Sequence, residues 1–221
     1  MQGGPRGQVI PQVIHQVWLG PAEPPQRWMD GWKYGHKYYN YRLWSEDNLR
    51  WLHNQELFDH FLQRRMFDAA CDVARVEILH KYGGLYVDAD MESVGDFELG
   101  SCLVLSEEPS MKEEFLISNA WMACLPGELL FRRYVTALSR ISGDDVFPNT
   151  AWNRTGPGLL TRLTAFHRGA VILPSWFFTD VPQYGQPPEP TRIGIHHFSS
   201  TVTKWKNAPS KLVAQEYSRG K

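Results

Sequence analysis

The sequence predicts a single-domain α/β fold with a central mixed sheet, and three observations support this. Segments with the alternation of a strand and segments with the periodicity of a helix follow one another along the chain, as in helices packed on a sheet. The 221 residues, of which 43% are hydrophobic, can bury one sizeable core. An apolar strand ends in two carboxylates, Asp88 and Asp90, at the edge where open α/β sheets place their ligands.

Each element has its own signal. Apolar, β-branched and aromatic runs mark the strands, and apolar residues at helical spacing mark the helices. Pro24-Pro25 opens the first helix, Ser45 caps the next, and Gly83-Gly84 stops the longest one. The expected order is a strand at 9–19, a helix at 24–34, a strand at 38–44, one or two helices within 46–64, a helix at 67–82, strands at 85–89, 101–106 and 114–121, helices at 126–142 and 156–168, strands at 170–173 and 192–198, and a terminal helix from Ser210.

These elements set the expected boundaries. Residues 1–8 are polar and glycine-rich and are expected to be a flexible N-terminus, residues 9–206 to form the domain, and residues 207–221 to add a C-terminal helix and tail. The loop Thr179–Thr191 is long and rich in proline. It is either a lid over a site or a stiff surface connection.

The segment from Asp72 to Asp90 carries the chemistry. Asp72 and Arg75 stand three residues apart, so they share one face of the predicted helix. After the glycine stop, a buried strand leads to Asp88 and Asp90, whose carboxylates repel each other unless a cation lies between them. A hard divalent cation with open positions for phosphate oxygens meets that need. The bland alternatives are solvated acids in a turn and a surface Asp/Arg ion pair.

This segment resembles the Asp-x-x-Arg … Gly-Gly-x-Tyr-x-Asp-x-Asp signature of glycosyltransferase family 32, and it is similar to the catalytic domain of the large clostridial glucosylating toxins. Further matches follow in order at 10–20, 41–44, 119–123, 155–157 and 195–198. The resemblance covers roughly residues 9–206. It implies a GT-A-like, Rossmann-type fold that binds a nucleotide sugar.

The resemblance also implies an activity, a metal-dependent retaining glycosyltransferase that moves a sugar from a nucleotide diphosphate donor to an acceptor hydroxyl. Asp88, Asp90 and His196 would hold Mn²⁺ or Mg²⁺, and Arg75 would place a fixed cation near the sugar and diphosphate, so Arg75, Asp88 and Asp90 are the expected catalytic residues. His196 and His197 are neighbours on a strand, so at most one of them can face the metal. The alternative for His196 is a core histidine bonded to a backbone carbonyl.

The remaining expected donor contacts come from several segments. Trp18 ends the first strand and would stack on the nucleobase, unless it is a core tryptophan. The resemblance places Asp72 on the sugar hydroxyls, and Asn119 on the sugar or the acceptor. Relatives carry Ser-Trp a few residues after the histidines to contact the diphosphate, whereas here Trp205 lies farther along and Lys204 is a substitute positive partner.

Two other functions compete with glycosyl transfer. A haloacid-dehalogenase-like phosphatase also ends an apolar strand in Asp-x-Asp and uses Mg²⁺, and Gly143-Asp144-Asp145 resembles its later acidic motif. Against it, Met91 stands where that family prefers Thr or Val, and the strand lies in mid-chain. The third function is a nucleotide-sugar-binding module that has lost transfer activity.

Charge and hydropathy bear on partners and location. With 23 basic against 24 acidic residues, the net charge of −1 gives no electrostatic reason to bind nucleic acid or an anionic membrane. The chain has no signal-peptide pattern and no apolar run approaching about 18 residues. We therefore expect a soluble, cytoplasmic enzyme, or a chain trimmed of its anchor, with a UDP- or GDP-sugar as donor and an acceptor that the sequence does not name.

Overall fold

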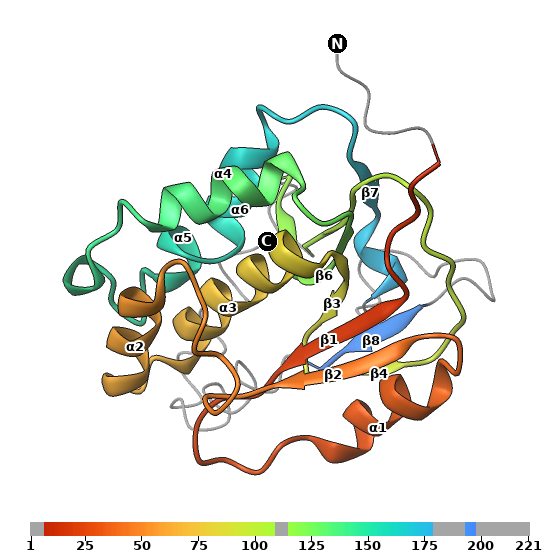
Figure 1. Ribbon diagram of the computed structural model, residues 1–221, viewed down its shortest axis with the longest axis horizontal. Helices are drawn as coiled ribbons and strands as arrows, with labels where there is room; N and C mark the ends of the chain where they lie inside the picture. The colour runs from red at the N-terminus through yellow and green to blue at the C-terminus, as the bar shows by residue number, and fades with distance from the viewer. Residues whose placement is uncertain (1–6, 109–114, 179–192, 198–221) are drawn as a thin grey trace, which may run out of the picture.

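The computed structural model describes residues 7–108, 115–178 and 193–197 (Figure 1). Their helices and strands follow one another as expected for an α/β chain. In order, they are β1 (Val13–Val17), α1 (Gln26–Gly35), β2 (Asn40–Trp44), α2 (Gln55–Gln63), α3 (Phe67–Tyr82), β3 (Gly84–Val87), β4 (Met91–Ser93), β5 (Val104–Glu107), β6 (Ile117–Cys124), α4 (Leu129–Leu138), the 3₁₀ turn η1 (Gly143–Asp145), α5 (Ala151–Arg154), α6 (Pro157–Thr164), β7 (Val171–Leu173), the 3₁₀ turn η2 (Ser175–Phe177) and β8 (Gly194–His196).

The six-stranded central sheet is mixed, as predicted, with strand order β2-β1-β3-β6-β5-β7. β1 is parallel to β2 and to β3, β6 is antiparallel to β3 and to β5, and β7 is parallel to β5. Five strands therefore run in one direction, and only β6 runs against them. The carboxyl ends of β1, β3 and β5 consequently meet at one edge of the sheet, together with the amino end of β6.

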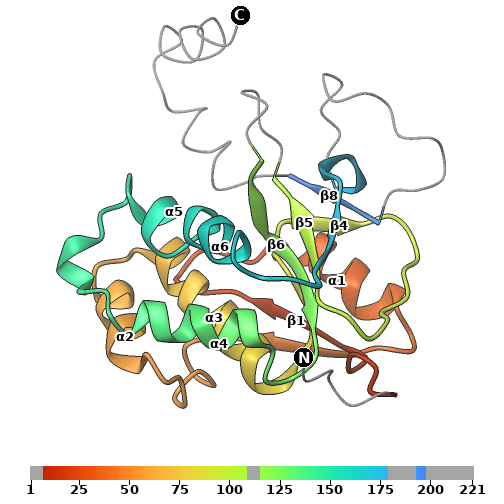
Figure 2. The ribbon, with the colours of Figure 1, turned by 90° about the horizontal axis from the view of Figure 1, so that it is seen from above.

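Helices cover both faces of this sheet (Figures 1 and 2). Successive residues of β3 alternate between the two faces: Tyr86 packs into a core cluster with α2, α3 and α4, and Leu85 and Val87 pack into a second cluster with Trp32 of α1. The same alternation in β6 sends Met122 to the first cluster. The molecule is thus built in three layers, with α1 and the small β4-β8 sheet on one side.

Two glycines join α3 to β3 at a tight turn. Gly83 has φ +61°, and a Cβ there would lie 2.6 Å from the backbone nitrogen of Pro126. Gly84 has φ +90°, and its Cβ would lie 2.7 Å from the carbonyl oxygen of Val13. Both the backbone conformation and the close approach exclude a side chain at these positions. The turn fixes the position of β3, and of the acids that follow it, relative to α3.

The prediction for the segment before α3 was wrong. We expected helix from residue 46 onwards, but the helix begins only at Gln55, and residues 45–53 form turns and loop. Buried Glu77 of α3 explains the difference, because its carboxylate accepts hydrogen bonds from the backbone N–H groups of His53 and Asn54. Those amides are satisfied by a side chain 24 and 23 residues away, so no preceding helical turn is needed.

Four short elements were not predicted: β4, α5 and the turns η1 and η2, each of three or four residues. Strand β8 falls inside the expected 192–198. The loop Thr179–Thr191, the helix from Ser210 and most of the expected N-terminal segment 1–8 lie outside the described residues. Among the helices that the structure describes, none combines the length and the apolar character needed to span a bilayer.

Candidate metal and donor site

The carboxyl edge of the sheet gathers most of the candidate residues. Asp88 follows β3 directly, Trp18 follows β1, and Asn119 lies near the start of the antiparallel β6. Strand topology therefore brings together side chains that are up to a hundred positions apart in sequence. His196 reaches the same place from β8, because its register opposite Met91 sets it beside Asp90.

Asp88, Asp90 and His196 each offer one ligand atom, and these atoms all lie within 4.8 Å of one another. The Nε2 atom of His196 is 3.2 Å from Oδ1 of Asp90 and 3.9 Å from Oδ2 of Asp88. Burial opposes the charged imidazole, but the hydrogen bond to Asp90 and the nearby carboxylates outweigh it, so the pKa of His196 is raised. The pocket thus has an excess of negative charge, and two carboxylates with one imidazole suit Mn²⁺ or Mg²⁺.

The structure separates the two histidines. His197 turns away from Asp88 and Asp90: its Nε2 lies 3.0 Å from Glu92, and its ring stacks on Trp28 with centroids 4.1 Å apart. Its backbone N–H still donates to the carbonyl of Asp90 at 3.1 Å. His196, and not His197, therefore presents its side chain to the acids, in keeping with the alternation of a strand.

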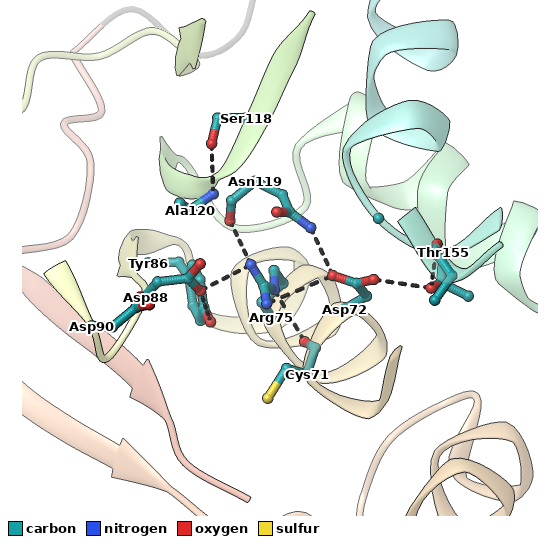
Figure 3. A network of polar contacts seen from close by, with 12 residues as sticks. Cys71, Asp72, Arg75, Tyr86, Asp88, Asp90, Ser118, Asn119, Ala120 and Thr155 are labelled. Atoms are coloured by element: carbon teal, nitrogen blue, oxygen red, sulfur yellow. Dashed lines mark hydrogen bonds and ion pairs between the residues drawn. The ribbon is translucent and has the colours of Figure 1, made fainter. Parts of the chain in front are cut away.

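Arg75 lies between the acids of α3 and those after β3 (Figure 3). Its Nη1 is 2.9 Å from Oδ1 of Asp88 and donates to the carbonyl of Asn119 at 2.9 Å, and its Nη2 is 3.6 Å from Oδ1 of Asp72. The ring of Tyr86 lies 4.9 Å from the guanidinium carbon. Asp72 and Arg75 are each only 6% exposed, so the pair is not the surface ion pair that was the alternative.

Asp72 is bonded on both oxygens. The side-chain amide of Asn119 donates to Oδ1 at 2.7 Å, and the hydroxyl of Thr155 donates to Oδ2 at 2.9 Å (Figure 3). Burial raises the pKa of Asp72 to about 6, and Arg75, Thr155 and Asn119 partly offset the rise. Each carboxylate oxygen has a second lone pair, so Asp72 can still accept a hydroxyl from a ligand.

Trp18 is half-buried, and its indole N–H donates to the carbonyl of Ala22 at 2.8 Å. It is therefore fixed at the sheet edge and does not belong to the buried core. The other two expected donor contacts, Lys204 and Trp205, lie outside the described residues.

Sequence reasoning missed Glu108, which follows β5 as Asp88 follows β3. Its Oε1 accepts a hydrogen bond from the indole of Trp152 at 3.2 Å. Burial raises the pKa of Glu108 to about 7, against the indole bond and the charge of His196, which lower it, whereas Asp72 and Asp88 add to the rise. The sequence could have predicted Glu108, because the strand before it was expected and its carboxyl end falls at the same sheet edge. It could not have predicted Trp152, because α5 has only four residues and so no recognisable helical pattern.

The phosphatase alternative finds no support at the site. Gly143-Asp144-Asp145 forms η1 beside α2, where Asp144 pairs with Arg64 at 2.5 Å. Asp144 is 72% exposed in its side chain, as expected for a surface acid.

A cavity of about 900 Å³ lies at the opposite edge of the sheet, between Gln12, Tyr38 and Phe97 among others. Its lining does not include the acids of the candidate site.

Comparison with known proteins agrees with this geometry. Residues 25–111 match the family described as a glycosyltransferase sugar-binding region containing a DXD motif, and Asp88-Ala89-Asp90 lies inside the matched range. This stretch of the chain is similar to that glycosyltransferase family. In sequence, an alignment of 94 positions that covers 37% of the chain is 33% identical to inositol phosphoceramide mannosyltransferase 3 of Schizosaccharomyces pombe. That match spans 24% of the relative's length.

The fold of the chain matches that of solved GT-A glycosyltransferase domains. It is similar to the PaToxG glycosyltransferase, with a TM-score of 0.59 over 71% of this chain and 69% of that chain, at 14% identity. It is also similar to the UDP-bound glycosyltransferase domain of the YGT toxin, with a TM-score of 0.51 over 75% and 79% of the two chains, at 10% identity. The GT-A-like fold expected from the sequence is confirmed.

Proposed function

We propose that this glycosyltransferase domain is a metal-dependent, retaining enzyme that transfers a sugar from a nucleoside diphosphate donor to an acceptor hydroxyl. The observation that carries the proposal is the convergence of Asp88, Asp90 and His196 within 4.8 Å, next to the buried guanidinium of Arg75. Such a cluster suits the binding of a diphosphate that leaves from the anomeric carbon.

The charge of the cluster argues for a metal. Asp72, Asp88 and Asp90 bring three negative charges, and Arg75 brings one positive charge. Even with His196 protonated, the cluster would repel a diphosphate. A divalent cation held by the two acids after β3 and by His196 would reverse that repulsion and neutralise charge on the leaving oxygen.

Other residues of the chain would bind the sugar, the base and the diphosphate of the donor. Arg75 is held in place by Asp88 and by the carbonyl of Asn119, so its charge is fixed before the donor arrives. Asp72 and Asn119 are hydrogen-bonded to each other at the buried end, where the hydroxyls of the donor sugar would meet them. Trp18, at the outer end, would stack on the base. Lys204 and Trp205 would contact the diphosphate, as the family resemblance implies.

Two parts of the proposal, the stereochemistry and the nucleotide of the donor, rest on similarity to other glycosyltransferases. Retention of configuration, by same-face attack or through a short-lived ion pair, is the stereochemistry of the family that the sequence resembles. The similar YGT toxin domain is UDP-bound, which supports a UDP donor, and a GDP-sugar is the other candidate. The acceptor is a hydroxyl of a glycan, glycoconjugate or other molecule.

The first experiment is a thermal-shift screen of UDP- and GDP-sugars with Mn²⁺. A donor present at about 100 times its Kd should stabilise the protein by about 2.7 kcal/mol. Asp90→Asn keeps the side-chain volume but removes the charge, so it should abolish most of the Mn²⁺-dependent shift. The matched control is Asp96→Asn, an exposed acid at the opposite sheet edge. If Asp90→Asn responds to Mn²⁺ and donor as the wild type does, the metal assignment is wrong.

The second experiment separates transfer from the two competing functions. With Mn²⁺ and donor but no acceptor, a transferase should slowly release nucleoside diphosphate and free sugar without a covalent phosphoenzyme. Rapid cleavage of an aryl phosphate, with a phosphorylated Asp88, would establish the phosphatase instead. Donor binding without turnover across an acceptor panel would establish the inactive binding module.

A further inference from the structure

Glu108 and Trp152 form a polar and aromatic pair that the roles above do not use. Glu108 follows β5 at the carboxyl edge, and Trp152 lies on α5. The indole N–H donates to Oε1 of Glu108 at 3.2 Å. The other oxygen, Oε2, is buried and has no hydrogen-bond partner in the part of the chain that the structure describes. A buried carboxylate oxygen without a donor costs free energy, so it calls for an external hydroxyl or amine.

The pair borders the candidate site. The charges of His196, Asp72 and Asp88 all act on the Glu108 carboxyl, which places it among them. The segment around α5 provides a second link: Trp152 of α5 donates to Glu108, and Thr155, the residue directly after α5, donates to Asp72. This short segment thus contacts one carboxylate of the donor site and one carboxylate outside it.

Bonding distinguishes the two carboxylates. Asp72 is bonded on both oxygens, whereas Glu108 is bonded on one, by Trp152, which is 40% exposed. The exposed indole offers a flat apolar surface, and beside it the buried Oε2 of Glu108 has no donor among the described residues. A pyranose has the complementary surface, since one face is lined by C–H groups and its rim by hydroxyls. A ligand reaching this pair comes from solvent, as an acceptor does.

We propose that Glu108 and Trp152 bind the acceptor, and that the acceptor is therefore a sugar. The indole packs against the sugar ring, and Oε2 of Glu108 accepts one of its hydroxyls. This inference rests on the proposed function, because an acceptor exists only if the domain transfers a sugar. It adds the substrate class that the family match does not give.

The test compares donor affinity with acceptor use. Glu108→Gln replaces the acceptor oxygen by an amide of the same shape, and Trp152→Ala removes the stacking surface. Each should lower kcat/KM for methyl hexoside acceptors roughly tenfold, the order of magnitude for the loss of one hydrogen bond or one aromatic contact. The Kd of the donor with Mn²⁺, measured by titration calorimetry, should stay within about twofold of the wild type because neither residue contacts the donor.

Glu107→Gln is the matched control, because its side chain points to the other side of β5 and lies near the backbone of Ser175. It should keep acceptor kcat/KM. Trp152→Ala changes a partly exposed position, so it tests the inference even if Glu108→Gln fails to fold.

The outcomes are distinguishable. Unchanged acceptor kcat/KM in folded variants, or a loss of donor affinity instead, would overturn the acceptor assignment. A wild-type domain that hydrolyses donor but uses no hexoside would overturn the sugar class. A wild-type domain that neither binds nor hydrolyses any donor would refute the proposed function itself, and this inference with it.

Discussion

At the scale of single residues, the site is organised by one buried cation. Arg75 contacts Asp88 and Asp72 and donates to the carbonyls of Asn119 and Cys71. Burial opposes its charge, but the carboxylates outweigh this, and the pKa of Arg75 is raised. The buried carboxylate of Asp72 and the partly buried carboxylate of Asp88 thus depend on one guanidinium for charge balance.

This dependence predicts the effect of two substitutions. Arg75→Ala leaves Asp72 and Asp88 without their cation and should cost about 3–5 kcal/mol of unfolding free energy. Arg75→Lys should recover little of that loss, because one ammonium cannot reach both acids and two carbonyls as the guanidinium fork does. Urea denaturation measures both. Arg64→Lys is the control: Arg64 pairs with exposed Asp144, and this substitution should change little. A Lys variant as stable as the wild type would refute this dependence.

Burial has the opposite outcome at His15: its imidazole is kept neutral, whereas the guanidinium of Arg75 is kept charged. Its Nε2–H donates to the carbonyl of Gly83 at 3.0 Å, and its Nδ1 accepts from the indole of Trp44 at 3.1 Å. Both ring nitrogens are therefore satisfied only in the neutral form. Burial lowers the pKa of His15 to about 4, helped by the charge of Arg42 and opposed by the Gly83 bond.

The predicted consequence is a histidine that stays neutral in mild acid. Because the folded pKa is below the unfolded one, its contribution to stability is present above about pH 6.5 and is lost as pH falls towards about 4. Asp72, with a raised pKa, acts in the opposite direction between about pH 4 and 6, so the total unfolding curve mixes the two effects. Imidazole ¹⁵N NMR isolates His15: it should show the Nε2–H tautomer at pH 5.5. A charged ring at that pH would contradict the structure.

At the scale of elements, sequence reasoning worked where local signals are strong. The helix expected at 67–82 is observed at Phe67–Tyr82, because sixteen residues give a clear pattern and two glycines end it. It failed at 46–53, since the contact with Glu77 that replaces helix there comes from a distant segment. Strand β4 and helix α5 have three and four residues, too few for any periodicity.

The turn between α3 and β3 gives a prediction at this scale. Gly83→Ala places a Cβ against the Pro126 nitrogen and the Cys124 carbonyl at 2.6 and 2.8 Å, in backbone at φ +61°. Backbone on both sides cannot yield, so we expect a loss of more than about 3 kcal/mol of unfolding free energy. Gly100→Ala is the control, since nothing lies within 4 Å of its Cβ and its φ is not positive. Equal denaturation midpoints for the two variants would contradict the geometry.

At the scale of the whole molecule, the direction of the strands makes the site. Because β1, β3 and β5 run in parallel, the residues that follow them, Trp18, Asp88 and Glu108, meet at one edge. An alternating pattern of strands and helices predicts such an edge, and so it predicts Asp88 and Trp18. It cannot predict Thr155, which bonds Asp72 from 83 residues away, because that contact depends on how α5 packs.

Two edges of the same sheet therefore offer different places for a nucleotide. Trp18 is fixed and half-buried at the carboxyl edge, near the acids that would hold the metal. The cavity of about 900 Å³ lies at the amino edge, where Tyr38 is 73% exposed. A diphosphate needs a metal to offset its charge, so the proposed function puts it at the first edge, where the candidate metal ligands lie. We therefore expect the cavity at the second edge to take no part in donor binding.

This choice is tested by a pair of aromatic substitutions. Trp18→Ala should weaken binding of UDP or GDP, whichever the wild type prefers with Mn²⁺, by about 1–3 kcal/mol, the range for one lost base–aromatic stack. Tyr38→Ala should leave that affinity unchanged, although it removes an exposed aromatic ring from the cavity at the amino edge. Titration calorimetry gives both values, and thermal unfolding shows whether the variants remain folded. If Trp18→Ala unfolds, Trp18 is a core residue after all, and if only Tyr38→Ala loses affinity, the nucleotide binds at the amino edge.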